Sequence, residues 1–104
     1  MGIYNDFYVF ANHRVIPVVH FSIYNRNIGG FFRDNLRDFQ SNEEYIIDGS
    51  LVARLLQAYN DETLTRSPLS NPRDPLIFPD QVERLCQVQK YIDAGYKVVY
   101  TQID

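Results

Sequence analysis

The apolar residues near the end of the chain recur at helical spacing. Five of them fall on one side of a helix over residues 80–94, namely Val82, Leu85, Cys86, Val88 and Ile92. This pattern is typical of an amphipathic helix that buries one face. Residues 96–103 are rich in β-branched and aromatic side chains, which predicts a strand. We therefore expect the chain to end in a helix followed by a strand.

Start and stop signals flank this helix. Asp80 is expected to cap the free N–H groups of the first turn, with Glu83 as the carboxylate that reaches back to the cap. Gly95 can adopt the left-handed conformation that ends a helix. Cys86 lies on the apolar stripe and has no second cysteine to pair with, so we predict a reduced thiol buried in the core.

Two aromatic and β-branched stretches open the chain. Residues 3–10 and 15–24 are predicted to be strands on either side of a polar turn at residues 12–14. Pro17 lacks an N–H group and therefore belongs at an edge, at a bulge or facing solvent. One of these two strands is accordingly expected to lie at the edge of the sheet.

The middle of the chain alternates apolar stripes with turn residues. Helical spacing predicts a short helix over residues 28–39 and a second helix over residues 50–60, capped by Asp48 or Ser50. Residues 41–49 fit a short strand or the start of a helix equally well.

Prolines interrupt the stretch from residue 61 to residue 79. Four of the five prolines of the chain lie there, which excludes regular structure. This loop is either a functional surface loop or a structural strap. We favour the strap, because its apolar residues would be costly to expose, namely Leu69, Leu76, Ile77 and Phe78.

Together these elements predict one α+β domain over residues 1–104. We expect a mainly antiparallel sheet with two or three helices packed on one face, because each helix has a single apolar stripe that needs a partner. A length of 104 residues and a hydrophobic share of 45% suit one compact core.

Charge and hydropathy narrow the expected surroundings. The net charge is −3, which disfavours broad electrostatic attraction to nucleic acid or to an anionic membrane. We see no secretory leader and no apolar run long enough to span a bilayer. A cytoplasmic protein without membrane attachment is the expectation.

Candidate catalytic residues are few. His13 and His20 are the two histidines, and no Cys or His cluster offers a transition-metal ligand set. Gly29 and Gly30 are not followed by the Lys-Ser or Lys-Thr of a phosphate loop and predict a turn. We therefore expect no cofactor, no metal and no catalysis. The alternative is a small hydrolase or transferase that uses His13 or His20 as a general base beside an aspartate.

Arginine and tyrosine are the more informative residues. Eight of the ten basic residues are Arg, and the chain has eight Tyr and seven Phe. Planar guanidinium and phenol groups are enriched where proteins bind each other. We predict a non-enzymatic protein-binding module, an inhibitor or accessory protein whose partner is another protein or a second copy in a homodimer. The predicted contact residues are Tyr24, Arg26, Phe31, Arg33 and Arg37, with Arg66 and Arg73 from the loop as second choice.

Two further considerations bear on this hypothesis. An aromatic, Arg-rich sheet could bind nucleic acid by stacking and by phosphate contacts, but the chain lacks an RNP-like motif and a basic excess. The order of the predicted elements is similar to that of small accessory proteins of phages and mobile elements. This similarity is architectural and assigns no role to any residue.

Overall fold

The first and last strands of the chain pair at the centre of the sheet. In the computed structural model, which describes residues 2–104, β1 (Tyr4–Phe10) is antiparallel to β4 (Lys97–Ile103), and Phe7 pairs with Tyr100. β2 (Val19–Tyr24) flanks β1, and β3 (Glu44–Ile47) flanks β4. The strand order is β2-β1-β4-β3, and every pairing is antiparallel.

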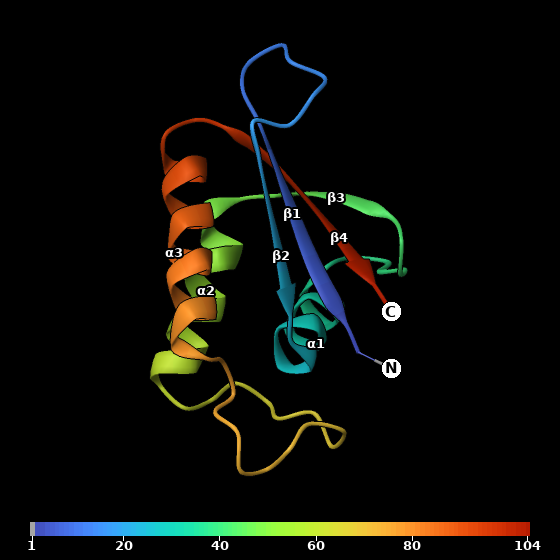
Figure 1. The fold of residues 1–104 in the computed structure, drawn as a ribbon, viewed down its shortest axis with the longest axis vertical. Coiled ribbons are helices and arrows are strands. Elements are labelled where there is room, and N and C mark those ends of the chain that lie inside the picture. The colour runs from blue at the N-terminus through green and yellow to red at the C-terminus, as the bar shows by residue number, and fades with distance from the viewer. Residues whose placement is uncertain (1) are drawn as a thin grey trace.

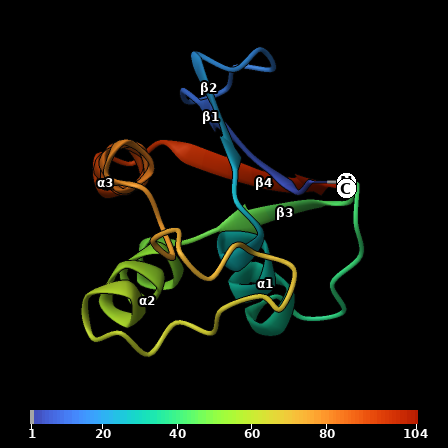
Figure 2. The ribbon, with the colours of Figure 1, turned by 60° about the horizontal axis from the view of Figure 1, so that its bottom comes forward.

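Three helices within residues 2–104 pack against one face of this sheet. They are α1 (Arg26–Asn35), α2 (Gly49–Asn60) and α3 (Pro79–Asp93). Figure 1 shows α2 and α3 side by side along one flank, and Figure 2 shows α1 and α2 on the same side of β3 and β4. The predicted α+β class is confirmed, with an antiparallel sheet covered by helices on one face.

An aromatic cluster joins α1 to the central strands. Phe32 from α1 stacks on Tyr100 with ring centroids 4.0 Å apart, and Phe7 lies 5.2 Å from Tyr100 and 5.7 Å from Phe32. All three side chains are fully buried. Large rings that pack at these distances contribute more than their buried area alone, so this cluster fixes α1 on the sheet.

The prediction for α2 is confirmed, including its cap. Asp48 has extended backbone angles, and its Oδ1 accepts a hydrogen bond of 2.9 Å from the N–H group of Leu51. Leu51, Val52 and Leu55 are buried against the core. The helix begins at Gly49, one residue before the predicted start.

The prediction for the start of α3 is wrong. The N-cap is Phe78, and the side chain of Gln81 accepts a 3.0 Å hydrogen bond from the Phe78 N–H group, so neither Asp80 nor Glu83 forms a capping box. Pro79 is the first helical residue, and its fixed φ favours that position. The helix therefore begins one residue before Asp80.

Cys86 is exposed, which contradicts the predicted buried thiol. Successive residues of a helix lie about 100° apart around its axis, and Leu85 already occupies the centre of the buried face with Val88. Cys86 is thus rotated away from the core. At the other end, Gly95 has a φ of 93°, as predicted for the residue that follows the helix.

The N-terminal strands agree with the prediction in part. β1 and β2 form, and β2 is an edge strand, but it begins at Val19 rather than at residue 15. Residues 11–18 form a longer connection that projects from the sheet at the top of Figure 1. Pro17 lies in this connection, where its missing N–H group interrupts no strand pairing.

Two other elements differ from the prediction. α1 spans residues 26–35 rather than 28–39, because the side chain of Asn25 accepts hydrogen bonds from the N–H groups of Asn27 and Ile28, while Asp38 adopts a positive φ of 53°. The undecided residues 41–49 contain β3, whose residue Tyr45 pairs with Tyr100.

Residues 61–78 connect α2 to α3 without regular structure. Leu64 and Ile77 are buried near its two ends, as expected for a structural strap. Leu69 and Phe78 are exposed, so the expectation that these two residues pack the connection down is wrong.

None of the helices described within residues 2–104 has the length and hydropathy of a membrane-spanning segment.

Candidate partner-binding groove

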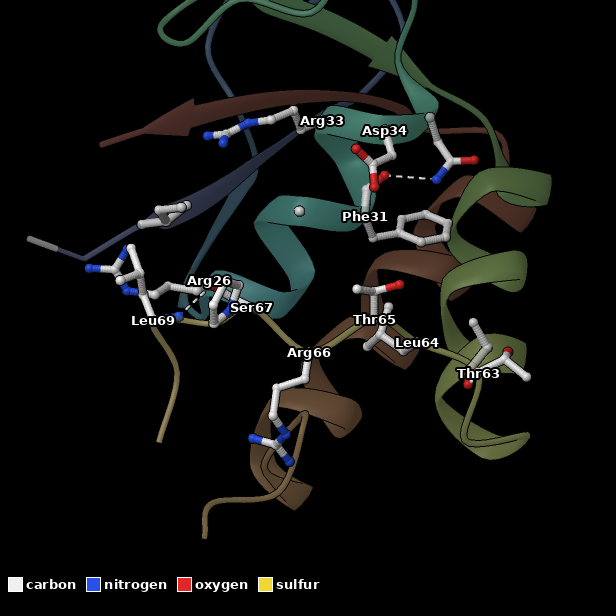
Figure 3. Close-up of a pocket in the computed structure, with 15 residues that line it drawn as sticks. Arg26, Phe31, Arg33, Asp34, Thr63, Leu64, Thr65, Arg66, Ser67 and Leu69 are labelled. Carbon is white, nitrogen blue, oxygen red and sulfur yellow. Dashed lines mark hydrogen bonds between the residues drawn. The ribbon is translucent and has the colours of Figure 1, made fainter. Parts of the chain in front are cut away.

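A groove of about 450 Å³ separates α1 from the first part of the 61–78 connection. One wall is α1, and the other is residues 63–69. From here on, the name strap refers to residues 63–69 alone. Figure 3 shows the strap crossing beneath α1. Four of the seven predicted contact residues line this groove: Arg26, Phe31, Arg33 and Arg66. The structure therefore brings together residues that are up to forty positions apart in the sequence.

Arg26 and Arg33 lie on the same side of α1. They are seven residues apart, so their Cα atoms are separated by about 10 Å along the helix axis. Arg26 is half-buried, and its guanidinium has no hydrogen-bond or carboxylate partner among residues 2–104. A guanidinium carries five N–H donors, so Arg26 is available to a ligand.

Arg33 is fixed by the protein itself. Its Nη2 donates a 3.1 Å hydrogen bond to Oε1 of the buried Gln102, and its guanidinium carbon lies 5.8 Å from the centre of the Phe39 ring. These contacts use one donor and one face of the guanidinium. Arg33 therefore offers a positioned positive charge, with donors to spare, at the edge of the groove.

Arg66 points away from α1. Its guanidinium donates to the carbonyl oxygens of Asn71 at 2.9 Å and Asp74 at 2.8 Å, and Figure 3 shows the side chain extending below the strap. These bonds hold together the turns that follow the strap. Arg66 therefore shapes one wall of the groove more than it offers a contact to a ligand.

Gly30 lies between the two arginines on α1 and lines the groove. A Cβ atom built on Gly30 would meet no atom within 4 Å, whereas one on Gly29 would lie 2.8 Å from Cγ2 of Ile3. Gly29 is thus needed for close packing on the sheet, and Gly30 leaves space. Both glycines were predicted to lie in a turn, but they lie within α1 and differ in the space around them.

The strap contains two backbone N–H groups without an internal partner. The N–H groups of Thr65 and Arg66 have no hydrogen-bond partner among residues 2–104, while the N–H group of Ser67 donates 2.7 Å to Oδ1 of Asn27. Asp34 on α1 is the one carboxylate among the lining residues. The groove thus combines guanidinium donors and one carboxylate with an apolar part formed by Ile3, Phe31, Leu64 and Leu69.

Two buried asparagines hold the strap and the following chain against α1. Asn27 binds Ser67 through its side-chain oxygen and donates 3.1 Å to the carbonyl oxygen of Leu76. Asn25 donates to the same carbonyl at 3.0 Å and to Oε1 of Gln81 at 2.9 Å. These contacts could not be predicted from the sequence, because nothing local indicates partners so distant in the chain.

A buried hydrogen-bond chain connects Arg33 to the centre of the sheet. Nε2 of Gln102 donates to the hydroxyl of Tyr100 at 2.8 Å, and this hydroxyl donates to Oδ1 of Asn5 at 2.6 Å. Burial raises the pKa of Tyr100 above its ordinary value, although the hydrogen bond with Gln102 acts in the opposite direction. The phenol therefore stays protonated and remains a donor at neutral pH.

The other three predicted contact residues lie outside the groove. Arg37 is almost fully exposed and lies 3.9 Å from the carboxylate of its neighbour Asp38. Arg73 is exposed in the connection beyond the strap. Tyr24 is at the end of β2, where its ring packs edge-on against Tyr4 at 4.9 Å. Arg37 and Arg73 therefore serve as natural comparisons for arginines within the groove.

The histidines lie away from the groove. His20 is on the uncovered face of the sheet, 3.3 Å from Oδ1 of the buried Asp6, and its ring stacks on Tyr8 with centroids 4.3 Å apart. His13 is exposed in the 11–18 connection with a positive φ of 59°. Within residues 2–104, no three His, Cys, Asp or Glu side chains are grouped as metal ligands.

No protein-family model, curated protein or solved structure matches this chain. The chemistry of the groove is therefore the basis for assigning a function.

Proposed function

We propose that the protein is a non-enzymatic protein-binding module whose partner occupies the groove between α1 and the strap. The observation that carries this proposal is the position of Arg26, which lines an open groove without an internal partner among residues 2–104. Phe31 and Leu69 add apolar contact area beside this charge. Arginine and aromatic side chains at a concave surface are typical of interface hot spots. By binding a segment of its partner in this groove, the protein would act as an inhibitor or accessory factor.

The features of β2 favour a different protein over a second copy joined by sheet extension. The carbonyl oxygens of Ser22 and Tyr24 accept 3.0 Å hydrogen bonds from Arg84 and Gln81 of α3. A strand that paired with β2 would need these same acceptors, so the side chains from α3 hinder pairing across the β2 edge of the sheet. Light scattering on the purified protein gives the oligomeric state directly, and we expect a monomer.

The hydrolase or transferase alternative depends on His20 and Asp6. These residues are within hydrogen-bond reach, which is the geometry of a base and its orienting carboxylate. However, the pair is on an uncovered sheet face and lies outside the groove between α1 and the strap. A binding module therefore explains more of the structure. Measured hydrolysis that is abolished by His20→Gln would reverse this preference.

Affinity capture from the native host, followed by variants in the groove, tests the proposal. Gly30→Leu fills the groove from an open position of α1, and we expect the captured protein to be lost. Arg37→Ala removes an arginine just beyond the same helix and should leave capture unchanged. Circular dichroism and thermal melting of both variants establish that the fold is intact. Capture that survives Gly30→Leu would show that the partner binds elsewhere.

A further inference from the structure

We infer that the groove takes an extended acidic peptide segment of the partner. This inference rests on the proposed function and specifies the chemistry of the occupant. Arg26 and Arg33 offer two guanidinium groups at the groove against the single carboxylate of Asp34, while Arg66 is committed to the Asn71 and Asp74 carbonyls, and the whole chain has a net charge of −3. The groove is thus a local basic site on an acidic protein. Carboxylates are the natural partners of guanidinium groups, because the two planar groups form paired, charge-assisted hydrogen bonds.

The strap indicates that the occupant is extended. The N–H groups of Thr65 and Arg66 have no partner among residues 2–104. Because consecutive N–H groups of an extended segment point to opposite sides, one of the two can donate to a carbonyl group of a peptide that lies alongside. Arg26 and Arg33 are about 10 Å apart along the opposite wall, a distance that an extended peptide covers in about three residues. Every second side chain of an extended peptide points to the same side, about 7 Å apart. Acidic side chains at alternate positions would therefore line the wall that carries both arginines while the backbone faces the strap.

A polynucleotide fits these observations less well. Asp34 lies in the same groove, and the backbone N–H groups of a peptide can donate to its carboxylate, whereas a phosphate backbone has no donor for it. The net charge of −3 opposes a ligand that carries one negative charge at every nucleotide. Ile3 and Leu69 also provide apolar surface that suits the side chains of a peptide.

Fluorescence anisotropy with defined probes tests the inference. The probe is a fluorescein-labelled decapeptide of alternating Glu and Thr, and the matched control replaces every Glu with Gln. We expect the Glu peptide to bind, with an affinity that falls as salt is raised, and the Gln peptide to bind about tenfold more weakly or not at all. A thymidine decanucleotide is the third probe and should bind more weakly than the Glu peptide.

Three variants locate the binding. Arg26→Gln should weaken binding of the Glu peptide by about fivefold or more, because it removes an unpaired guanidinium. Gly30→Leu should abolish binding, and Arg37→Gln should leave it unchanged. The inference is overturned if the Glu peptide fails to bind, if the Gln peptide binds equally well, if Arg26→Gln has no effect, or if the decanucleotide binds most tightly.

The two proposals fail in different ways. If a captured host protein is lost with Gly30→Leu but is retained with Arg26→Gln and in high salt, the groove binds a partner whose segment is not acidic. The proposed function then stands and the inference falls. If the host protein is retained with Gly30→Leu, the proposed binding site itself is wrong.

Discussion

The hydroxyl of Tyr100 donates a 2.6 Å hydrogen bond to Oδ1 of Asn5 within the core, between the two central strands. Removal of this hydroxyl leaves a buried amide oxygen without its partner. We expect Tyr100→Phe to lower the free energy of unfolding by about 1 to 3 kcal/mol, the cost of an unsatisfied buried polar group. Urea denaturation measures the change. Tyr96→Phe is the control, because Tyr96 is exposed. This variant should unfold at the same urea concentration as the parent protein.

The same tyrosine predicts a loss of stability in alkali. Burial raises the pKa of Tyr100 above 10.0, its ordinary value in the unfolded chain. Above pH 10 the unfolded phenol loses its proton while the folded phenol keeps it, so stability present below pH 10 is lost as the pH rises further. Denaturation at a series of pH values should show a shallower alkaline decline in Tyr100→Phe than in the parent. Equal slopes would mean that other groups cause the decline.

The two long helices predict which substitutions unfold the protein. Leu55 in α2 and Leu85 in α3 are fully buried, so Leu55→Asp and Leu85→Asp each place an unpaired charge in the core. The expected cost is several kcal/mol, comparable with the total stability of a small domain. Cys86→Asp is the matched control one residue along α3, and it should retain a cooperative transition because Cys86 is exposed. Parent-like melting of either leucine variant would contradict the assigned helix faces.

The sequence predicted those elements that are specified by neighbouring residues. The apolar stripe and the Asp48 cap that define α2 lie next to each other in the sequence, and β4 is one continuous stretch of β-branched and aromatic residues. The start of α3 was misplaced because Asp80 is a favourable cap, whereas Pro79 favours the first helical position and makes Phe78 the cap. Cys86 was misplaced because a stripe drawn from hydropathy is wider than the face that Leu85 and Val88 bury.

The groove depends on contacts that no local pattern contains. Its strap is held by the hydrogen bond between Ser67 and Asn27, forty positions apart, and by the bonds of Asn25 and Asn27 to Leu76. Composition suggested arginine and aromatic contacts, and Arg26, Phe31 and Arg33 do lie in one groove. It could not separate them from Arg37, because α1 ends at Asn35 and leaves Arg37 outside.

Asp48 makes the stability of the protein depend on pH in the acidic range. Its carboxylate accepts hydrogen bonds from the Ser50 hydroxyl and the Leu51 N–H group, and these bonds lower the pKa of Asp48 below 3.8. Its stabilising contribution is present above that ordinary value and is lost as the pH falls below it. Asp48→Ala should cost about 1 kcal/mol at neutral pH, as for the loss of an N-cap. Asp48→Asn should keep most of the cap and reduce the acid dependence, which denaturation at pH 3 and pH 7, on either side of that value, would show.

The paired glycines of α1 predict opposite effects of the same substitution. A methyl group on Gly30 meets no atom within 4 Å, so Gly30→Ala should raise the free energy of unfolding by about 0.5 to 1 kcal/mol through its better helix propensity. A methyl group on Gly29 would lie 2.8 Å from Ile3 and 3.2 Å from Nε2 of Gln102. Gly29→Ala should therefore destabilise the protein, because α1 must shift from the sheet.

Urea denaturation of both alanine variants measures this contrast, and each variant is the control for the other because the helix propensities are equal. If Gly30→Ala were also destabilising, the groove would be narrower at Gly30 than the structure shows, and filling it with Gly30→Leu would no longer be a clean test of binding. If Gly29→Ala were neutral, α1 could move on the sheet, and the spacing of Arg26 and Arg33 against the strap would not be fixed. Opposite signs would establish both that α1 is firmly seated and that its outer face is open to a ligand.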